Sequence, residues 1–385
     1  MYNAPVRATI RTDRIRHNVQ VIRKQAHPAA LMAVLKADAY GHGVRRIAPL
    51  LSDAGVRAFA VARVHEALAL RDLGIEGFIL VLAPPTRDQL PAYVAHNLHA
   101  SVTSPDVARL LLHSDLSASL SVHVNVDTGM HRLGVAWGAV PTWWTRLHKA
   151  PMLSVTGVYT HLATADAPAH PLNARQLQRF ANTVAALRPS PRAVHVANTD
   201  ALTHLPDRLP TDAQYVRAGL GLYGLTSTPP DARYQRPTDL QMALSLEAQV
   251  VHLHTVPEGE TVSYGARWTA PSDTRVATIG IGYGDGYPRA ASGSAYVRVH
   301  GTLRPMVGSV CMDLCMVDLG SPNSTLAKRT AVGDAAILFD DTAPTLHDLA
   351  RWSQTIPYEL CCQLAPRVPR RYQDPTPATA ENGTI

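Results

Sequence analysis

The sequence LMAVLKADAYGHGVRRIAPLL, residues 31–51, joins an apolar run, a polar turn with two glycines and a segment with helical apolar spacing. The apolar run is typical of a buried strand, and it ends abruptly at Lys36. Burying an unpaired ammonium costs several kcal/mol. This lysine is therefore either solvated at a strand end or joined to a carbonyl cofactor as a Schiff base. The segment alone leaves both interpretations open.

The alternation of strand-like and helix-like segments continues over the first 235 or so residues. Amphipathic segments lie between short apolar runs; residues 44–51, for example, place Val44, Ile47 and Leu50 on one face. Eight apolar runs end at Leu35, Val61, Leu82, Val102, Val126, Tyr159, Ala197 and Val216. Eight strand–helix units predict an α/β fold, a (β/α)8 barrel of the TIM type over residues 11–235.

The pattern changes after about residue 236, where strand-like segments follow one another closely. We expect a mainly β C-terminal domain over residues 236–372, with one helix over residues 345–355 that begins near Thr345. A proline-rich linker is predicted at residues 226–237.

The two ends of the chain carry separate expectations. Residues 1–10 are predicted to form a strand that packs on the C-terminal domain. Residues 373–385, rich in proline and small polar residues, are predicted to be a disordered tail.

Composition limits the possible classes of protein. A chain of 385 residues is longer than one hydrophobic core ordinarily supports, so two domains are expected. The net charge of +6 is dispersed, which argues against nucleic-acid binding and suits a site for a phosphate and a carboxylate. The N-terminus lacks a signal-peptide pattern, and no apolar run could span a membrane, so a cytoplasmic protein is expected.

The four cysteines form two close pairs, Cys311 with Cys315 and Cys361 with Cys362. Their spacings, three intervening residues and none, are not those of a structural zinc site. We therefore expect buried free thiols and no metal.

Polar residues cluster just after the predicted barrel strands. They are Lys36, Arg132, His161, Asn198, Thr199, Arg217 and Gly219. Active sites of such barrels are built on the carboxyl ends of the strands, so these side chains should meet at one mouth. Gly219 and Gly221 suit a backbone cradle for a phosphate, although a tight turn would also require glycine.

Eight motifs then point to a family. They are AVLKADAYGHG (33–43), DTGMHRLG (127–134), THLATAD (160–166), VRAGLGLYG (216–224), SYG (263–265), GYGDGYPR (282–289), CMDLCMVD (311–318) and IPYELCCQLAPRVPRRY (356–372). Together they resemble alanine racemases, pyridoxal-phosphate enzymes with a barrel and a β domain. The resemblance covers nearly the whole chain, in the family's order.

The resemblance implies a two-base racemase that interconverts L-alanine and D-alanine. Lys36 would hold pyridoxal 5′-phosphate as a Schiff base and serve as the base on one face of the substrate. Tyr264 would serve on the other face, contributed by the partner subunit of a homodimer. Arg217 would face the pyridine nitrogen, which an arginine cannot protonate. The family's role is supplying D-alanine for peptidoglycan.

The resemblance also implies the remaining site residues. Arg132 and a backbone N–H of the partner's Met312 would bind the substrate carboxylate, and Tyr283 would narrow the entrance. The cofactor would contact Lys36, Tyr40, His161, Asn198, Thr199, Arg217, Gly219, Leu220 and Tyr358.

Four positions depart from the family pattern. Asp38 stands where asparagine is common, His131 where glycine is common, and Thr199 where serine is usual. Asn125 occupies the position of a carboxylated lysine that braces the arginine in many members, so a bound anion such as chloride could take that place.

Several rival functions stay open on the sequence. A broad-specificity or serine racemase should have a wider entrance than one with Tyr283 and Tyr358. A related decarboxylase would need a cysteine–aspartate pair, which Cys311 and Asp313 superficially offer. A non-catalytic pyridoxal-phosphate carrier built on a lone barrel would not need the β domain. A purely structural or interaction protein would not explain the clustered strand-end residues.

Overall fold

The computed structural model describes residues 4–227 and 239–374. Most of the predicted linker and of the predicted tail therefore lies outside the described residues. Contacts divide the chain into two units: Asn18–Leu240, and Met1–His17 together with Gln241–Ile385. Within the described residues no helix is both long and apolar enough to cross a membrane.

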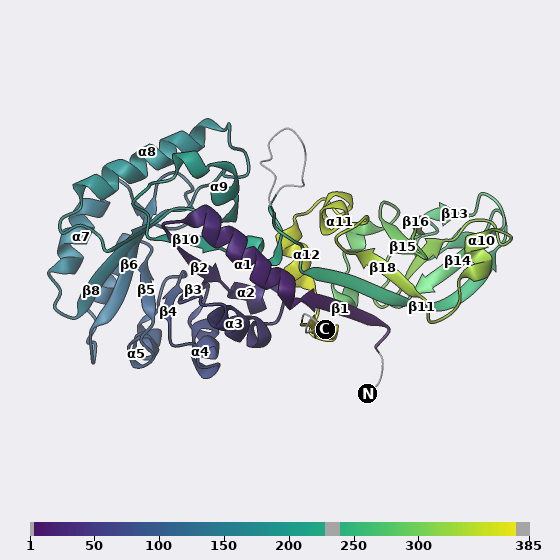
Figure 1. Cartoon of the computed structure of the whole chain (residues 1–385), viewed down its shortest axis with the longest axis horizontal. Coiled ribbons are helices and arrows are strands. Elements are labelled where there is room, and N and C mark those ends of the chain that lie inside the picture. Colours follow the sequence, from purple (N-terminus) through teal and green to yellow (C-terminus); the bar gives the residue numbers. More distant parts are fainter. Residues whose placement is uncertain (1–3, 228–238, 375–385) are drawn as a thin grey trace, which may run out of the picture. The chain divides into compact units, whose positions relative to one another are not determined.

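The unit Asn18–Leu240, here called the barrel unit, is a closed parallel barrel (Figure 1). Its strands are β2 (Ala30–Val34), β3 (Ala58–Val61), β4 (Phe78–Val81), β5 (His99–Val102), β6 (Leu120–Asp127), β8 (Leu153–Tyr159), β9 (Ala193–His195) and β10 (Tyr215–Ala218). Parallel pairing of β10 with β2 and of β5 with β6 completes the circle. The predicted (β/α)8 barrel is confirmed.

Helices surround the strands of this unit (Figure 1). They are α1 (Thr12–Ala26), α3 (Val44–Asp53), α4 (Val64–Asp72), α5 (Leu90–Ala95), α6 (Pro105–Leu112), α7 (Val140–His148), α8 (Pro171–Ala186) and α9 (Thr199–His204). The predicted face of α3 is buried at Ile47, Leu50 and Leu51. Ser104 begins α6 by accepting a hydrogen bond from Val107 N–H.

Two strand ends differ from the prediction by two residues, and those of β2, β4 and β6 differ by one. Strand β9 stops at His195 rather than Ala197, and β10 runs to Ala218 rather than Val216. Arg217 therefore lies within β10 and not after it. Its pairing with Met32 of β2 extends the ladder, which a short apolar run in the sequence does not reveal.

The other unit, here called the β unit, contains one eight-stranded sheet. Its spatial order is β14 (Thr274–Ile279), β17 (Cys315–Asp318), β16 (Thr302–Val307), β15 (Tyr296–Val299), β18 (Ala335–Phe339), β11 (Leu244–Val256), β1 (Val6–Arg11) and β19 (Arg370–Gln373). A small hairpin, β12 (Thr261–Val262) with β13 (Trp268–Thr269), forms a separate two-stranded sheet whose Val262 and Trp268 pack in a cluster with residues of the large sheet. The mainly β C-terminal domain is confirmed.

The β unit holds more helix than expected. Thr345 caps the predicted helix α11 (Leu346–Trp352) by accepting from Asp348 N–H. Two short helices, α10 (Thr325–Arg329) and α12 (Pro357–Gln363), go beyond the prediction. Each is too short to leave a clear helical pattern in the sequence.

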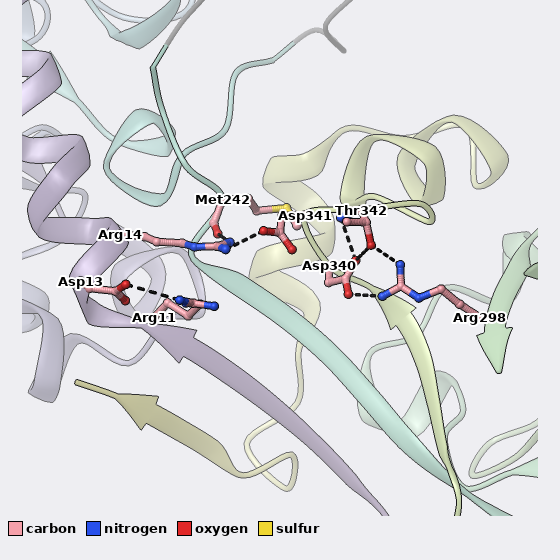
Figure 2. Close-up of polar contacts among 8 residues, drawn as sticks. All are labelled: Arg11, Asp13, Arg14, Met242, Arg298, Asp340, Asp341 and Thr342. Carbon is pink, nitrogen blue, oxygen red and sulfur yellow. Dashed lines mark hydrogen bonds and ion pairs between the residues drawn. The ribbon is translucent and has the colours of Figure 1, made fainter. Parts of the chain in front are cut away.

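The N-terminal strand β1 lies between β11 and β19, with its alternate residues Val6, Ala8 and Ile10 buried. Figure 2 shows how the start of α1 is tied to the same unit: Arg14 donates to Met242 O at 2.7 Å and pairs with Asp341 at 2.5 Å. These bonds explain why the unit includes residues up to His17, beyond the expected residue 10.

The C-terminal boundary also differs by a few residues. Gln373, expected in the tail, is the last residue of β19 and pairs with Arg11 of β1. Gln241, rather than residue 236, begins the C-terminal part of the β unit.

Candidate active site

Lys36 follows β2 and begins α2 (Lys36–Tyr40), a turn of unusual handedness. The residues from Ala37 to Tyr40 all have φ between 53° and 56°, the left-handed region. Each such residue costs about 1–2 kcal/mol in an L-amino-acid chain. Strain of this kind persists only where its surroundings enforce it, and it is concentrated at functional sites.

Specific hydrogen bonds enforce the left-handed turn. Glu66 of α4 accepts from Ala37 N–H at 2.7 Å, and Gly41 N–H donates to Ala37 O at 2.9 Å. Asp38 accepts from Val44 N–H at 2.7 Å and so fixes the start of α3. Because an asparagine side chain offers the same acceptor, the departure at Asp38 preserves this contact. The Lys36 Nζ lies 5.9 Å from the centre of the Tyr40 ring.

Arg217 occupies the interior of the barrel, only 4% exposed. Its Nη1 donates to His195 Nδ1 at 2.8 Å and to His195 O at 2.9 Å. Its Nη2 donates to Thr160 O at 2.7 Å and Val196 O at 2.9 Å, and lies 3.3 Å from His161 Nδ1. Burial lowers the pKa of Arg217 to about 10, so it is still charged at neutral pH.

The contacts of Arg217 fix the proton positions of two buried histidines. An arginine only donates, so Nδ1 of His195 must accept and its proton lies on Nε2. That Nε2–H then donates to His123 Nδ1, 3.0 Å away. Burial, followed by the charge of Arg217, lowers the pKa of His195 far below its ordinary value, and burial lowers that of His123 to about 3. Both rings are neutral, in the tautomer that serves Arg217.

Three positive charges gather around His161. Burial first, and then the charges of Arg217, Arg132 and Lys36, lower the pKa of His161 to about 3. The backbone of this residue is held by Gln176 of α8, which donates to His161 O at 3.0 Å. A neutral imidazole surrounded by cations marks an electropositive mouth suited to an anionic ligand.

Another part of the mouth is built around glycines. A Cβ on Gly219 would come within 2.3 Å of the Tyr40 hydroxyl, so this position must lack a side chain. Thr199 accepts a hydrogen bond from Gly221 N–H at 3.2 Å, which leaves its own O–H as a donor. Asn198 caps α9 by accepting from Ala201 N–H, and Leu220 is fully buried.

Arg132 lies on an exposed loop between β6 and β7 (Val135–Ala136). Among the described residues no side chain or carbonyl pairs with its guanidinium. Asn125 lies on β6 beside Tyr159 of β8 and is 9% exposed.

Tyr264 lies in the β unit, on the turn between β12 and β13, and is 74% exposed. Ser263 (φ 68°) and Ala266 (φ 47°) flank it in the left-handed region. Ser309 donates to Tyr264 O at 2.9 Å, and Ser263 donates to Ser309 O at 2.8 Å. The backbone of Tyr264 is thus fixed while its ring projects into solvent.

Two further loops of the β unit carry Met312 and Tyr283, 55% and 47% exposed. Backbone bonds from Tyr283 N–H to Cys311 O and from Gly284 N–H to Met312 O join the loops. Arg367 also bridges them, bonding Asp285 at 2.7 Å and Asp313 at 2.8 Å. No acceptor among the described residues meets the Met312 N–H.

The predicted site residues therefore form two groups. The barrel unit holds Lys36, Tyr40, Arg132, His161, Asn198, Thr199, Arg217, Gly219 and Leu220 at the carboxyl ends of its strands. The β unit holds Tyr264, Tyr283, Met312 and Tyr358, the last in the first turn of α12.

Cysteine placement corrects one expectation. Cys315 and Cys361 are buried thiols, but Cys311 is half-buried and Cys362 is exposed. Cys362 is exposed because it shares the short helix α12 with the buried Cys361, and adjacent helix positions face different sides. Within residues 4–227 and 239–374, no three metal-ligating side chains lie together.

Sequence reasoning missed His123, His195 and Gln176, which support Arg217 and His161. A signal was present in β6, SVHVNVD, where polar residues alternate with valines. In a barrel strand that is covered on both sides, such alternation places polar side chains on one buried face.

Comparison with known proteins identifies both units. Residues 10–227 match the family model "Alanine racemase, N-terminal domain", and residues 243–372 match "Alanine racemase, C-terminal domain". The alanine racemase of Acidithiobacillus ferrooxidans is 38% identical over 369 residues, which is 95% of this chain and 98% of that protein.

Solved structures agree with this match. The biosynthetic alanine racemase of Pseudomonas aeruginosa superposes with a TM-score of 0.87 at 33% identity, covering 96% of this chain and 100% of that one. A histidine racemase from Leuconostoc mesenteroides superposes with a TM-score of 0.83 at 31% identity, covering 97% and 99%. The same fold thus accompanies more than one substrate name.

Proposed function

The chain belongs to the alanine racemase family, and we propose that it interconverts L-alanine and D-alanine with pyridoxal 5′-phosphate. It is accordingly an amino-acid racemase, an isomerase. The observation that carries the proposal is the electropositive mouth. There the positive charges of Arg217, Arg132 and Lys36 all lower the pKa of His161. A substrate carboxylate and a cofactor phosphate are both anions, and such a mouth attracts them.

The pyridine end of the cofactor fits the free donor of Arg217. Its Nη1 and Nη2 face protein acceptors, whereas no acceptor among the described residues meets its Nε–H. That N–H can donate to a pyridine nitrogen. Because Arg217 keeps its proton at neutral pH, the ring nitrogen stays unprotonated, which disfavours side reactions such as transamination.

The phosphate end fits the glycine turn. The missing side chain at Gly219 lets the Tyr40 hydroxyl approach this turn closely, and the Thr199 hydroxyl retains a donor. Backbone N–H groups of Gly219 and Leu220, with Asn198 nearby, complete a donor set suited to a phosphate. His161 lies at the other side of the site, and we assign Tyr358 to the phosphate by resemblance.

When bound, pyridoxal phosphate supplies the electron sink that makes the Cα–H of alanine acidic. Lys36 would hold this group, and its Nζ would remove or return the Cα proton on one face. The Tyr264 Oη does the same on the other face, so a proton lost from one side is replaced from the opposite side. Arg132 and the free Met312 N–H hold the carboxylate during both transfers.

We further propose a homodimer in which Tyr264 and Met312 serve the site of the second copy. The support is exposure: Tyr264, Tyr283 and Met312 together display an apolar, aromatic surface on the β unit. Contiguous exposed apolar groups on fixed loops are typical of a protein interface. In this arrangement Tyr283 narrows the entrance and excludes larger amino acids.

The test is racemisation of L-alanine in deuterium oxide by the protein loaded with pyridoxal phosphate. We expect D-alanine that carries deuterium at Cα, with little turnover of L-serine, L-lysine, L-ornithine or L-histidine. Fast turnover of a larger substrate would show that this amino acid, rather than alanine, is the substrate. A protein of the same fold from Leuconostoc mesenteroides is named a histidine racemase. Release of carbon dioxide would indicate a decarboxylase, and bound cofactor without any exchange would indicate a carrier.

The physiological role follows from the product. D-alanine supplied in the cytoplasm would enter peptidoglycan, and the similar Pseudomonas enzyme is itself described as biosynthetic. Expression in a bacterial strain that requires added D-alanine should restore growth without it. Failure to restore growth, despite racemisation in vitro, would reject this role and leave the activity standing.

A further inference from the structure

The loop that carries Arg132, residues 128–134, is held at both ends by backbone contacts. Its flanking strands pair with each other through Val126 with Val135 and Asp127 with Ala136. Gly134 N–H donates to Thr103 O at 2.7 Å. The loop is therefore short and closed, and what remains adjustable is its tip.

Asp127 organises the tip from inside. One carboxylate oxygen accepts from Gly129 N–H at 2.9 Å and from His131 N–H at 3.1 Å. The other oxygen lies 2.9 Å from His131 Nδ1. Burial alone would raise the pKa of Asp127, but these bonds outweigh it and the pKa is lowered. Asp127 is thus a carboxylate, so His131 Nδ1 must be the donor.

His131 adopts φ 56°, a conformation that favours glycine. Its imidazole is 79% exposed and so gains nothing from burial. The one described contact that offsets the backbone strain is the bond to Asp127.

The outer side of the loop is anchored separately. Arg179 and Gln176 of α8 donate to Thr128 O at 2.9 Å and to Thr128 Oγ1 at 3.1 Å. Those bonds hold the beginning of the loop. They do not reach residue 132, which directly follows His131.

We propose that His131 is a positioning residue for Arg132: its bond to Asp127 holds the peptide before Arg132, so the guanidinium is presented to the substrate carboxylate. The inference rests on the proposed function for the role of Arg132. His131 itself touches neither substrate nor cofactor. We call its hydrogen bond to Asp127 the clamp.

Two variants separate the clamp from the backbone conformation. His131→Gly relieves the strain and removes the clamp. His131→Asn tolerates the same φ, and its side-chain amide nitrogen occupies the position of the imidazole Nδ1, so it can still donate to Asp127. We expect His131→Gly to raise the KM for alanine about three- to tenfold, with kcat changed less than about twofold. His131→Asn should stay within about twofold of the parent in both constants.

Hydrogen exchange of the holoenzyme without substrate supplies a readout that does not depend on activity. Amides of residues 129–133 should exchange faster in His131→Gly and at the parental rate in His131→Asn. The inference is overturned if His131→Gly matches the parent in KM and exchange, or if His131→Asn behaves like His131→Gly. If exchange changes as expected but the parent does not racemise alanine, the proposed function fails while the clamp stands.

Discussion

The two units of this chain differ in which predicted site residues they bury and which they expose. The barrel unit buries its charged Arg217 at 4% exposure, with the neutral His195 and His123 behind it. The β unit instead exposes Tyr264 at 74% and Met312 at 55%. Ordinary globular surfaces do the reverse, since charges are solvated and large apolar groups are covered. Both departures concern site residues.

The difference shows how the two groups of predicted site residues are held. In the barrel unit every donor of the Arg217 Nη atoms is matched to an acceptor, so that half is preorganised by its own contacts. In the β unit only the backbone of Tyr264 is fixed, and its side chain is 74% exposed. The barrel group is thus held by its own contacts, whereas the exposed group would be covered only in the proposed homodimer.

Removing the nucleophile of the barrel half should have the largest effect. Lys36→Ala is expected to lower racemisation by more than about 10⁴-fold, because both the covalent anchor and one base are lost. Chiral chromatography of the product alanine measures it. Lys36→Arg, which keeps the charge but cannot form the Schiff base, should be equally inactive; activity within tenfold of the parent in either variant would contradict the assignment.

Removing the base of the exposed half should be less severe and different in kind. Tyr264→Phe is expected to lower racemisation about 10²–10⁴-fold while Cα deuterium exchange of one enantiomer continues on the face served by Lys36. Nuclear magnetic resonance of alanine in deuterium oxide separates exchange from inversion. Tyr296→Phe, at another exposed tyrosine of the β unit, is the matched control and should leave both rates unchanged.

The buried network predicts a large effect on stability. Arg217→Gln should lower the free energy of unfolding by about 3–5 kcal/mol, because His195 and buried carbonyls lose their donors. Arg132→Gln, at an exposed arginine without a partner among the described residues, should change it by less than about 0.5 kcal/mol. Urea titration of both variants measures their free energies of unfolding. Similar decreases in the two variants would show that the buried network does not stabilise the fold more than an exposed arginine does.

The glycine cradle predicts an effect on cofactor affinity. A methyl group at Gly219 would overlap the Tyr40 hydroxyl, so Gly219→Ala should weaken pyridoxal-phosphate binding by about 1–3 kcal/mol. Gly138→Ala, with nothing within 4 Å of the added Cβ, should leave it unchanged. Absorbance titration of the apoenzyme measures both affinities; equal affinity would place the phosphate elsewhere.

The last prediction concerns stability in acid. Folding lowers the pKa of His123 and of His161 to about 3, whereas each titrates near 6.5 when unfolded. Their contribution to stability is therefore complete above about pH 6.5 and is lost as the pH falls toward 3, by up to about 1.4 kcal/mol per histidine and pH unit.

Hydrogen exchange at pH 7 and pH 5.5 checks this expectation. Amides of the barrel strands should lose protection faster than those of the β unit, where no histidine has a comparably low pKa among the described residues. Equal losses in both units, or a barrel that gains protection in acid, would contradict it.

The sequence predicted the barrel well, because each strand–helix unit leaves a local pattern of apolar residues. For the same reason most of the barrel residues proposed for the site lie at strand ends, as predicted. It could not predict that Arg217 lies inside β10 or that His195 and His123 support it, since those contacts join strands far apart in the chain. The alternation in β6 was the one local sign.

The left-handed turn after Lys36 is a second feature that the sequence alone could not predict. Ala37 and Ala39 are ordinary helix formers, and nothing in their identity indicates a positive φ. The conformation depends on Glu66, which lies about thirty residues away and accepts from Ala37 N–H. Tertiary contacts here override local preference, as they do at strained functional positions.

The most direct test of the central claim is an engineered heterodimer that carries Lys36→Ala in one copy and Tyr264→Phe in the other, isolated through two different affinity tags. If each site combines Lys36 of one copy with Tyr264 of the other, one of the two sites is intact and the heterodimer should show about half of the parental activity. If both residues serve the site of their own copy, each site lacks one base. Activity no higher than the mean of the two variant homodimers would then contradict the account.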